Sequence, residues 1–178
     1  MKPQPAEHEQ LISALDAAVA EAETFFRGTD ENLRAGEQTA RKSLAQLIFW
    51  HLEYVHVVEA LVAGRVYSPT HGTLTELNAL AARQVPDEPM RVLARRLSYR
   101  QKQLAKRLRR LTDWSLSFPL RADDTSCSVA GRILRAEAHI RSQVARLRRA
   151  ARQNARAAGV IGLGAVDGFA LPGARHYF

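Results

Sequence analysis

The sequence predicts an all-α protein, a four-helix bundle with one short extra helix between its second and third long helices. Four long segments place apolar residues at steps of three and four, which is the spacing of one helical face. No segment shows sustained strand-like alternation bounded by hairpin turns. A chain of 178 residues is long enough for one domain with a full core. We therefore expect a bundle over residues 7–156 and a Gly-rich C-terminal tail over residues 157–178.

The first helix is expected from Glu7 and is followed by a polar connection. Its apolar stripe consists of Leu11, Leu15, Val19, Ala22 and Phe26. Gly28 is a plausible stop, because glycine is common just past the end of a helix. We read the polar residues 29–38 as a connection with room for one short helical turn.

The second helix is expected from Thr39 to Ala63, ending at Gly64. Its stripe consists of Leu44, Ile48, His51, Val55, Val58 and Val62. His51 is the one polar member of this face. It is either a buried imidazole bonded to a partner side chain or a working residue that lines a cleft between helices. Trp50 and Tyr54 flank the stripe and are candidates for the walls of such a cleft.

The chain between the second and third long helices carries the short extra helix. Residues 65–72 contain Pro and Gly and are expected to form a loop. Thr73 and Glu76 have the spacing of a capping box, which predicts a short helix over TLTELNALAARQ. Asp87 is a candidate cap for the third long helix, with Pro89 in its first turn.

The third and fourth long helices are expected up to about Leu111 and from Thr125 or Ser126 to Arg156. The seam of the third consists of Met90, Leu93, Leu97, Gln101, Leu104, Leu108 and Leu111. The stripe of the fourth consists of Val129, Ile133, Ala136, Ile140, Val144 and Leu147. Trp114 and Phe118, in the irregular segment between them, are expected to cover the core.

Composition argues for a cytoplasmic protein outside the membrane. No run of eighteen apolar residues is present, and the first residues lack the apolar region of a secretory signal. Cys127 stands alone, so no disulfide can form within the chain. The net charge of +8 is unevenly distributed: residues 1–90 carry 7 Lys/Arg and 13 Asp/Glu, whereas residues 91–156 carry 18 Lys/Arg and 4 Asp/Glu. This split indicates either a polyanion site or acidic and basic helices that attract one another.

Three short motifs resemble the DinB-like (DinB/YfiT) superfamily of four-helix bundles. Residues 43–53, SLAQLIFWHLE, are similar to the family's helix 2 pattern, and residues 72–78, GTLTELN, to the segment before its third helix. The fourth helix resembles the family helix in which many members carry two histidines four residues apart. The likeness spans roughly residues 7–152. It implies a small cytoplasmic protein with a ligand cleft, related to thiol-dependent transferases, metal-dependent hydrolases and metal-free detoxifying proteins.

The resemblance also implies where a metal site would lie, and this chain departs from it. Metal-binding members use one histidine on helix 2 and two on helix 4, and the equivalent positions here are Gln46, Arg135 and His139. Gln is a poor ligand for Zn or Ni, and an arginine cannot lose its proton to bind a metal. We therefore expect no metal and no other cofactor.

These observations lead to one preferred function and one alternative. The preferred function is binding, with or without transformation, of a small molecule in an inter-helix cleft. His51, Glu137 and His139 are the candidate catalytic residues, and a Glu137–His51 pair would form either an acid/base couple or a structural contact. Trp50, Tyr54 and Arg135 are the candidate ligand-binding residues.

The alternative function is a non-enzymatic interaction scaffold, or a binder of a polyanion or nucleic acid, that uses the basic face of the third and fourth helices. An anionic small ligand held by Arg132, Arg135 or Arg141 is a further possibility. The chain has no helix-turn-helix, zinc-knuckle or RNA-recognition signature, which makes nucleic acid the less favoured of these partners. A homodimer is compatible with the sequence, and no membrane partner is expected.

Overall fold

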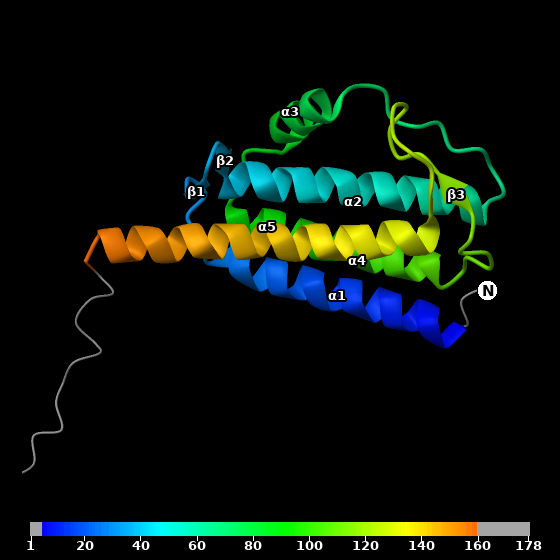
Figure 1. The fold of residues 1–178 in the computed structure, drawn as a ribbon, viewed down its shortest axis with the longest axis horizontal. Helices are drawn as coiled ribbons and strands as arrows, with labels where there is room; N and C mark the ends of the chain where they lie inside the picture. The colour runs from blue at the N-terminus through cyan, green and yellow to red at the C-terminus, as the bar shows by residue number, and fades with distance from the viewer. Residues whose placement is uncertain (1–4, 160–178) are drawn as a thin grey trace, which may run out of the picture.

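The computed structural model describes residues 5–159 and is mostly helical (Figure 1). Its helices are α1 (Pro5–Arg27), α2 (Ala40–Val62), α3 (Leu74–Gln84), α4 (Met90–Leu108) and α5 (Val129–Ala157). The predicted helical class is confirmed and all five predicted helices are present, although α4 ends at Leu108, three residues before the predicted end at about Leu111. The predicted Gly-rich tail lies, from residue 160 onward, outside the described residues.

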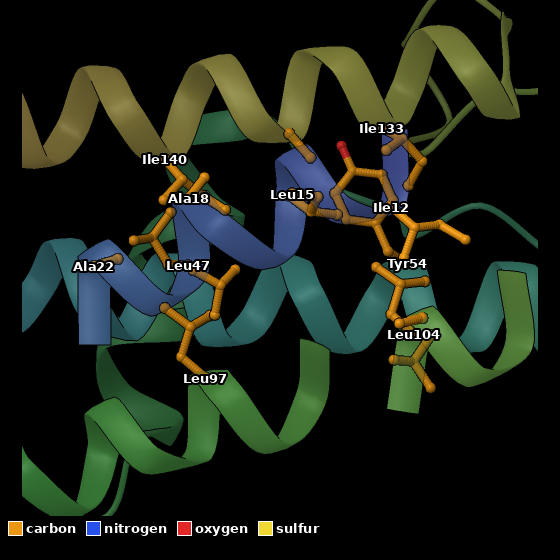
Figure 2. Packing of buried hydrophobic residues seen from close by; sticks show 14 of the residues in the cluster. Ile12, Leu15, Ala18, Ala22, Leu47, Tyr54, Leu97, Leu104, Ile133 and Ile140 are labelled. Atoms are coloured by element: carbon orange, nitrogen blue, oxygen red, sulfur yellow. The ribbon is translucent and has the colours of Figure 1, made fainter. Parts of the chain in front are cut away.

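The long helices pack side by side, and their apolar stripes meet in one core. α1 packs against α4 and α5, α2 packs against α4, and α3 lies on α2 (Figure 1). Figure 2 shows buried side chains from all four long helices converging, among them Leu15, Leu47, Leu97 and Ile140. Each such side chain contributes about 1.5–3 kcal/mol when it is withdrawn from water. The stripes predicted from the sequence are therefore the faces that hold the helices together.

Helix ends follow local capping chemistry, with one correction. Thr39 caps α2 by accepting a hydrogen bond from the Lys42 backbone N–H at 3.1 Å. The capping box of Thr73 and Glu76 is present at the start of α3, as predicted. Ser128 caps α5, so that this helix begins at Val129, three or four residues later than the sequence suggested.

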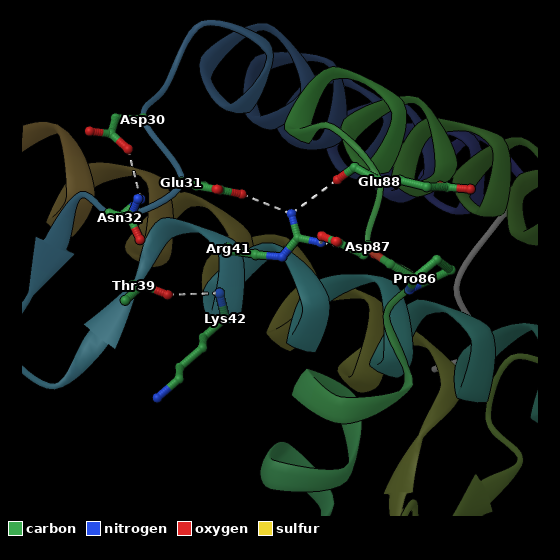
Figure 3. Close-up of polar contacts among 9 residues, drawn as sticks. All are labelled: Asp30, Glu31, Asn32, Thr39, Arg41, Lys42, Pro86, Asp87 and Glu88. Atoms are coloured by element: carbon green, nitrogen blue, oxygen red, sulfur yellow. Dashed lines mark hydrogen bonds and ion pairs between the residues drawn. The ribbon is translucent and has the colours of Figure 1, made fainter.

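The predicted cap of α4 is wrong. Pro89 occupies the N-cap position, and no side chain caps the helix. Asp87 instead contacts the guanidinium of Arg41 at 3.4 Å, because the turn around Pro86 directs its carboxylate toward α2 (Figure 3). The same guanidinium donates hydrogen bonds to Glu31 and to the backbone oxygens of Pro86 and Glu88. Arg41 thus links the connection after α1 and the connection before α4 to the start of α2.

Two very short antiparallel ladders replace irregular structure that the sequence predicted. β1 (Arg34–Ala35) pairs with β2 (Gln38–Thr39), so the connection after α1 forms a tight turn and not a helical one. Gly36 has a φ of 66° in this turn, a conformation that favours glycine. β3 (Ser117–Phe118) pairs with β4 (Cys127–Ser128) just before α5. Two-residue strands carry too little alternating pattern to be recognised in a sequence.

The connection before α5 covers one end of the core and reaches across to the loop before α3. Trp114 and Phe118 are buried, as predicted. The Thr70 backbone bonds to Leu120 and Ala122, which holds residues 120–124 against the loop that follows α2. This contact positions a lid-like segment beside α2 and α5. Among the described helices, none combines the length and apolar content of a membrane-spanning segment.

Candidate functional site

A cavity of about 410 Å³ lies between α2 and α5 under residues 120–124. It exists because α2 and α5 approach each other closely at few positions, while each packs extensively on another helix. The lining consists of Leu47, Trp50, His51 and Tyr54 from α2, Arg132, Arg135, Ala136, His139 and Ile140 from α5, and Leu74, Leu120, Arg121 and Asp124 from the connections. Its size and its mixture of an apolar wall with a few polar groups are typical of small-molecule sites.

Five of the six predicted site residues line this one cavity. They are Trp50, His51 and Tyr54 from the second helix, and Arg135 and His139 from the fifth. Arg135 and His139 lie four residues apart and so share one side of α5. Helical spacing led to Trp50, His51 and Tyr54 on one wall, and the family resemblance led to Arg135 and His139 on the other.

Glu137, the sixth predicted residue, does not line the cavity. At about 100° per residue it lies roughly 200° around α5 from both Arg135 and His139. Its carboxylate accepts a hydrogen bond from Arg141, which also contacts Glu21 on α1. The predicted Glu137–His51 pair is not formed, because Glu137 is on the α1 side of the helix.

His51 is held by a chain of hydrogen bonds that crosses from α2 through α4 to α1. The residue is 2% exposed, and its Nε2 lies 2.9 Å from Oε1 of Gln101. The amide nitrogen of Gln101 donates to Oδ1 of Asp16 at 2.6 Å. Because the Asp16 carboxylate can only accept, it orients the amide so that its oxygen faces the imidazole. A neutral imidazole carries one N–H, so His51 then donates either to Gln101 from Nε2 or to the Leu47 backbone oxygen from its other ring nitrogen.

Burial sets the protonation of His51. Desolvation lowers its pKa to about 4, against the opposing effects of hydrogen bonds to Gln101 and to the Leu47 backbone. The imidazole is consequently neutral at pH 7. A base is most effective when its pKa lies near the working pH, so His51 is a weak general base in the ligand-free protein.

Arg132 is the most buried cation of the cavity wall. It is 5% exposed, its Nη1 pairs with Asp124 at 2.7 Å, and its Nη2 donates to the backbone oxygens of Phe118 and Thr125. Its Nε–H is buried and has no partner among the described residues. A buried donor of this kind is costly unless something accepts its hydrogen bond.

The remaining polar residues of the wall differ in whether they already have a partner or are available to a ligand. Arg135 is exposed and forms no ion pair within the described residues, so its charge is available to a ligand. Desolvation, chiefly, raises the pKa of Tyr54 to about 12, which keeps its phenol protonated. Trp50 donates its indole N–H to Asn78 on α3 at 3.0 Å, which fixes this wall of the cavity.

The pKa of His139 is also lowered. The first cause is partial desolvation and the second is the positive charge of Arg146. Because the His139 side chain remains exposed, water screens part of this effect. The lowered pKa favours the neutral imidazole of His139 at pH 7, so this residue adds little to the positive charge of the cavity.

The residues at the metal positions implied by the family resemblance do not fit a metal site. Gln46 is buried beside Gln38, with 3.4 Å between their side-chain amides, and it does not line the cavity. Arg135 carries a permanent charge that would repel a cation. Over residues 5–159, no group of three His, Cys, Asp or Glu could hold a metal ion. The side chains at these three positions are therefore unsuited to a metal.

Sequence reasoning missed the residues that support His51 and close the cavity. Gln101 gave one signal, since it is the only polar residue in the seam of α4. Asp16 gave none, because a carboxylate beside an apolar stripe is the normal pattern of an amphipathic helix. Arg121 and Asp124 reach the cavity only because Thr70 holds their segment in place.

The chain was also compared with protein-family models, with curated proteins and with solved structures, and none of these comparisons gave a match. The likeness to DinB-like proteins therefore depends on the motifs in residues 43–53, residues 72–78 and the fourth long helix.

Proposed function

We propose that this protein is a DinB-like four-helix bundle that binds a small anionic molecule between α2 and α5 without the family's metal. Binding is the primary function in this proposal. Transformation of the ligand would be a second step, in which His51 and His139 are the groups within the cavity that can exchange protons.

The charge of the cavity wall supports an anionic ligand. Arg121, Arg132 and Arg135 face one carboxylate, Asp124, and the lowered pKa of each histidine of the wall favours its neutral form at pH 7. Asp124 pairs with Arg132, and Asp123 pairs with Arg121 at 3.2 Å, so Arg135 is the one arginine of the wall that forms no ion pair within the described residues. The wall therefore keeps an excess of positive charge. In a partly buried site, such a charge strengthens hydrogen bonds to a carboxylate or phosphate.

The exposed guanidinium of Arg135 is the observation that carries the proposal. It lies on the cavity wall and forms no ion pair within the described residues, so its charge and its N–H groups are open to a ligand. Arg132 adds a second cation to the wall, although its Nε–H is enclosed by protein and does not open into the cavity. Trp50, Tyr54 and Leu74 offer apolar surface to the remainder of the ligand.

A binding experiment with matched anionic and neutral probes tests this proposal. The probes are 4-phenylbutyrate, octanoate and phenyl phosphate, each beside its neutral amide or alcohol, in buffer containing EDTA. We expect the anions to raise the melting temperature and the neutral counterparts to have little effect. Isothermal titration then gives the dissociation constant of the best anion.

Two arginine variants on α5 distinguish binding inside the cavity from attraction by the overall positive charge of the protein. Arg135→Gln should weaken anion binding by about tenfold, the equivalent of about 1.4 kcal/mol. Arg149→Gln removes the same charge from an exposed position outside the cavity and should change binding by less than twofold. Equal losses in both variants, or no stabilisation by any anion of the panel, would overturn the proposal.

A further inference from the structure

The outward face of α4 carries an uninterrupted row of exposed basic residues. This α4 ridge consists of Arg91, Arg95, Tyr99, Lys102, Lys106 and Arg110. At about 100° per residue the positions from Arg91 to Lys106 fall within an arc of roughly 80°, opposite the buried seam that contains Leu97 and Leu104, and Arg110 follows just past the end of the helix. Tyr99 is 59% exposed in the middle of the row. From Met90 to Leu108 the helix contains no acidic residue.

The ridge is distinct from the basic residues that hold the helices together. Arg96, Arg107 and Arg109 of the same segment pair with Glu88, Glu59 and Glu9, respectively. The five cations of the ridge form no ion pair within the described residues. The structure thus divides the basic residues into one set that complements acidic neighbours and one set that faces solvent.

The α4 ridge is electrostatically unfavourable when no partner is bound to it. Like charges three or four residues apart on a helix repel one another, and the ridge contains such pairs at Arg91–Arg95, Lys102–Lys106 and Lys106–Arg110. A partner with a dense negative charge would relieve this repulsion. The ridge is separate from the cavity, because no residue of α4 lines it.

The chemistry of the ridge favours phosphates over other partners. A membrane-surface helix needs an apolar face for insertion, and that of α4 is buried in the core. A protein interface usually has an apolar centre, whereas the ridge offers only Tyr99. Single strands bind to a series of aromatic side chains, and a single tyrosine is not a series.

Between the two kinds of duplex, the shape of an exposed helix favours DNA. The major groove of B-form DNA is about 12 Å wide and admits an α-helix, while that of A-form RNA is deep and narrow. We infer that the α4 ridge faces the major groove of double-stranded DNA and binds the phosphates along its edges without reading the bases. The sequence offered nucleic acid as an alternative partner for the basic face of the third and fourth long helices together, and the inference narrows that surface to the α4 ridge.

The inference makes a quantitative statement about salt. Each neutralised phosphate contributes about −0.9 to the slope of log K against log salt, so five cations give a slope of roughly −3 to −5. Neutralising one cation should reduce the slope by about one and weaken binding on the order of tenfold at 0.1 M salt. Two duplexes of unrelated sequence should bind with equal affinity.

The test is fluorescence anisotropy of labelled 20-base-pair DNA with the full chain at 50–200 mM NaCl. Lys102→Gln/Lys106→Gln is compared with Arg149→Gln/Arg152→Gln, which removes the same charge from exposed positions on α5. All four positions are exposed and form no ion pair within the described residues, so both variants should fold, which circular dichroism verifies. We expect the α4 variant to bind DNA more than tenfold more weakly, with a slope of log K against log salt that is less steep by about two. The α5 variant should bind DNA with an affinity within threefold of that of the wild type.

Three results would overturn the inference. Equal losses in both double variants would show that bulk charge, not the ridge, determines binding. Equal or tighter binding of a duplex RNA, a single strand or a poly-glutamate peptide would show that double-stranded DNA is not the preferred partner. A slope near zero would show that phosphate contacts do not drive association.

Discussion

The buried imidazole of His51 should make the stability of this protein depend on pH between about 7 and 4. An unfolded histidine has a pKa of about 6.5, whereas burial lowers that of His51 in the folded protein to about 4. Between these values the unfolded chain binds a proton that the folded protein does not. Stability from this residue is therefore fully present above pH 6.5 and is lost as the pH falls toward 4.

The magnitude follows from the two pKa values. Lowering the pH from 7.5 to 5 should cost the wild type about 2 kcal/mol through His51 alone, and the full loss below pH 4 approaches about 3 kcal/mol. His51→Gln removes the titrating group and keeps an amide that can donate to Gln101. The difference between the two proteins isolates His51, because every other titrating group is present in both.

Urea unfolding at pH 7.5, 6.5, 5.5 and 5.0 measures the free energy of unfolding of each protein. His51→Gln should be the less stable protein at pH 7.5, and the gap should narrow by about 2 kcal/mol at pH 5. A gap that stays constant over this range would refute the reasoning, since it would mean that the folded protein protonates His51 as readily as the unfolded chain.

Two further predictions concern the supports of the site. Gln101→Leu should destabilise the protein by roughly 2–4 kcal/mol in urea unfolding at pH 7.5, because it leaves both His51 and Asp16 without their buried partner. The control is Gln103→Leu, on the half-buried flank of α4, which should destabilise the protein by less than about 1 kcal/mol. Thr73→Ala should cost about 1 kcal/mol by removing the capping box of α3. Its effect should appear as faster hydrogen exchange confined to α3, and equal acceleration throughout α2 and α4 would contradict a local role.

The sequence predicted the helices and most of the cavity wall, because both depend on helical periodicity. Residues four apart share a face wherever a helix is continuous, so the spacing alone pairs Trp50 with Tyr54 and Arg135 with His139. The same periodicity argues against Glu137, which lies two positions from each member of the second pair. The prediction that Glu137 pairs with His51 is wrong, because its side of α5 faces α1.

The rest of the site depends on contacts between distant segments. The His51–Gln101–Asp16 chain joins three helices, and no local pattern specifies which seam residue meets which imidazole. The segment that carries Arg121 and Asp124 is fixed by hydrogen bonds to Thr70, some fifty residues earlier. Such long-range pairings are set by tertiary packing and leave no periodic signal in one sequence.

The two tryptophans of the chain offer the most direct test of the binding proposal. Trp50 lines the cavity, and Trp114 stacks on His8 outside it. In a ¹H–¹⁵N correlation spectrum with EDTA present, titration with 4-phenylbutyrate should shift the indole N–H signal of Trp50 in a saturable manner. The indole N–H signal of Trp114 should not shift. If neither signal moves, or both move alike and without saturation, an anion does not occupy the cavity between α2 and α5.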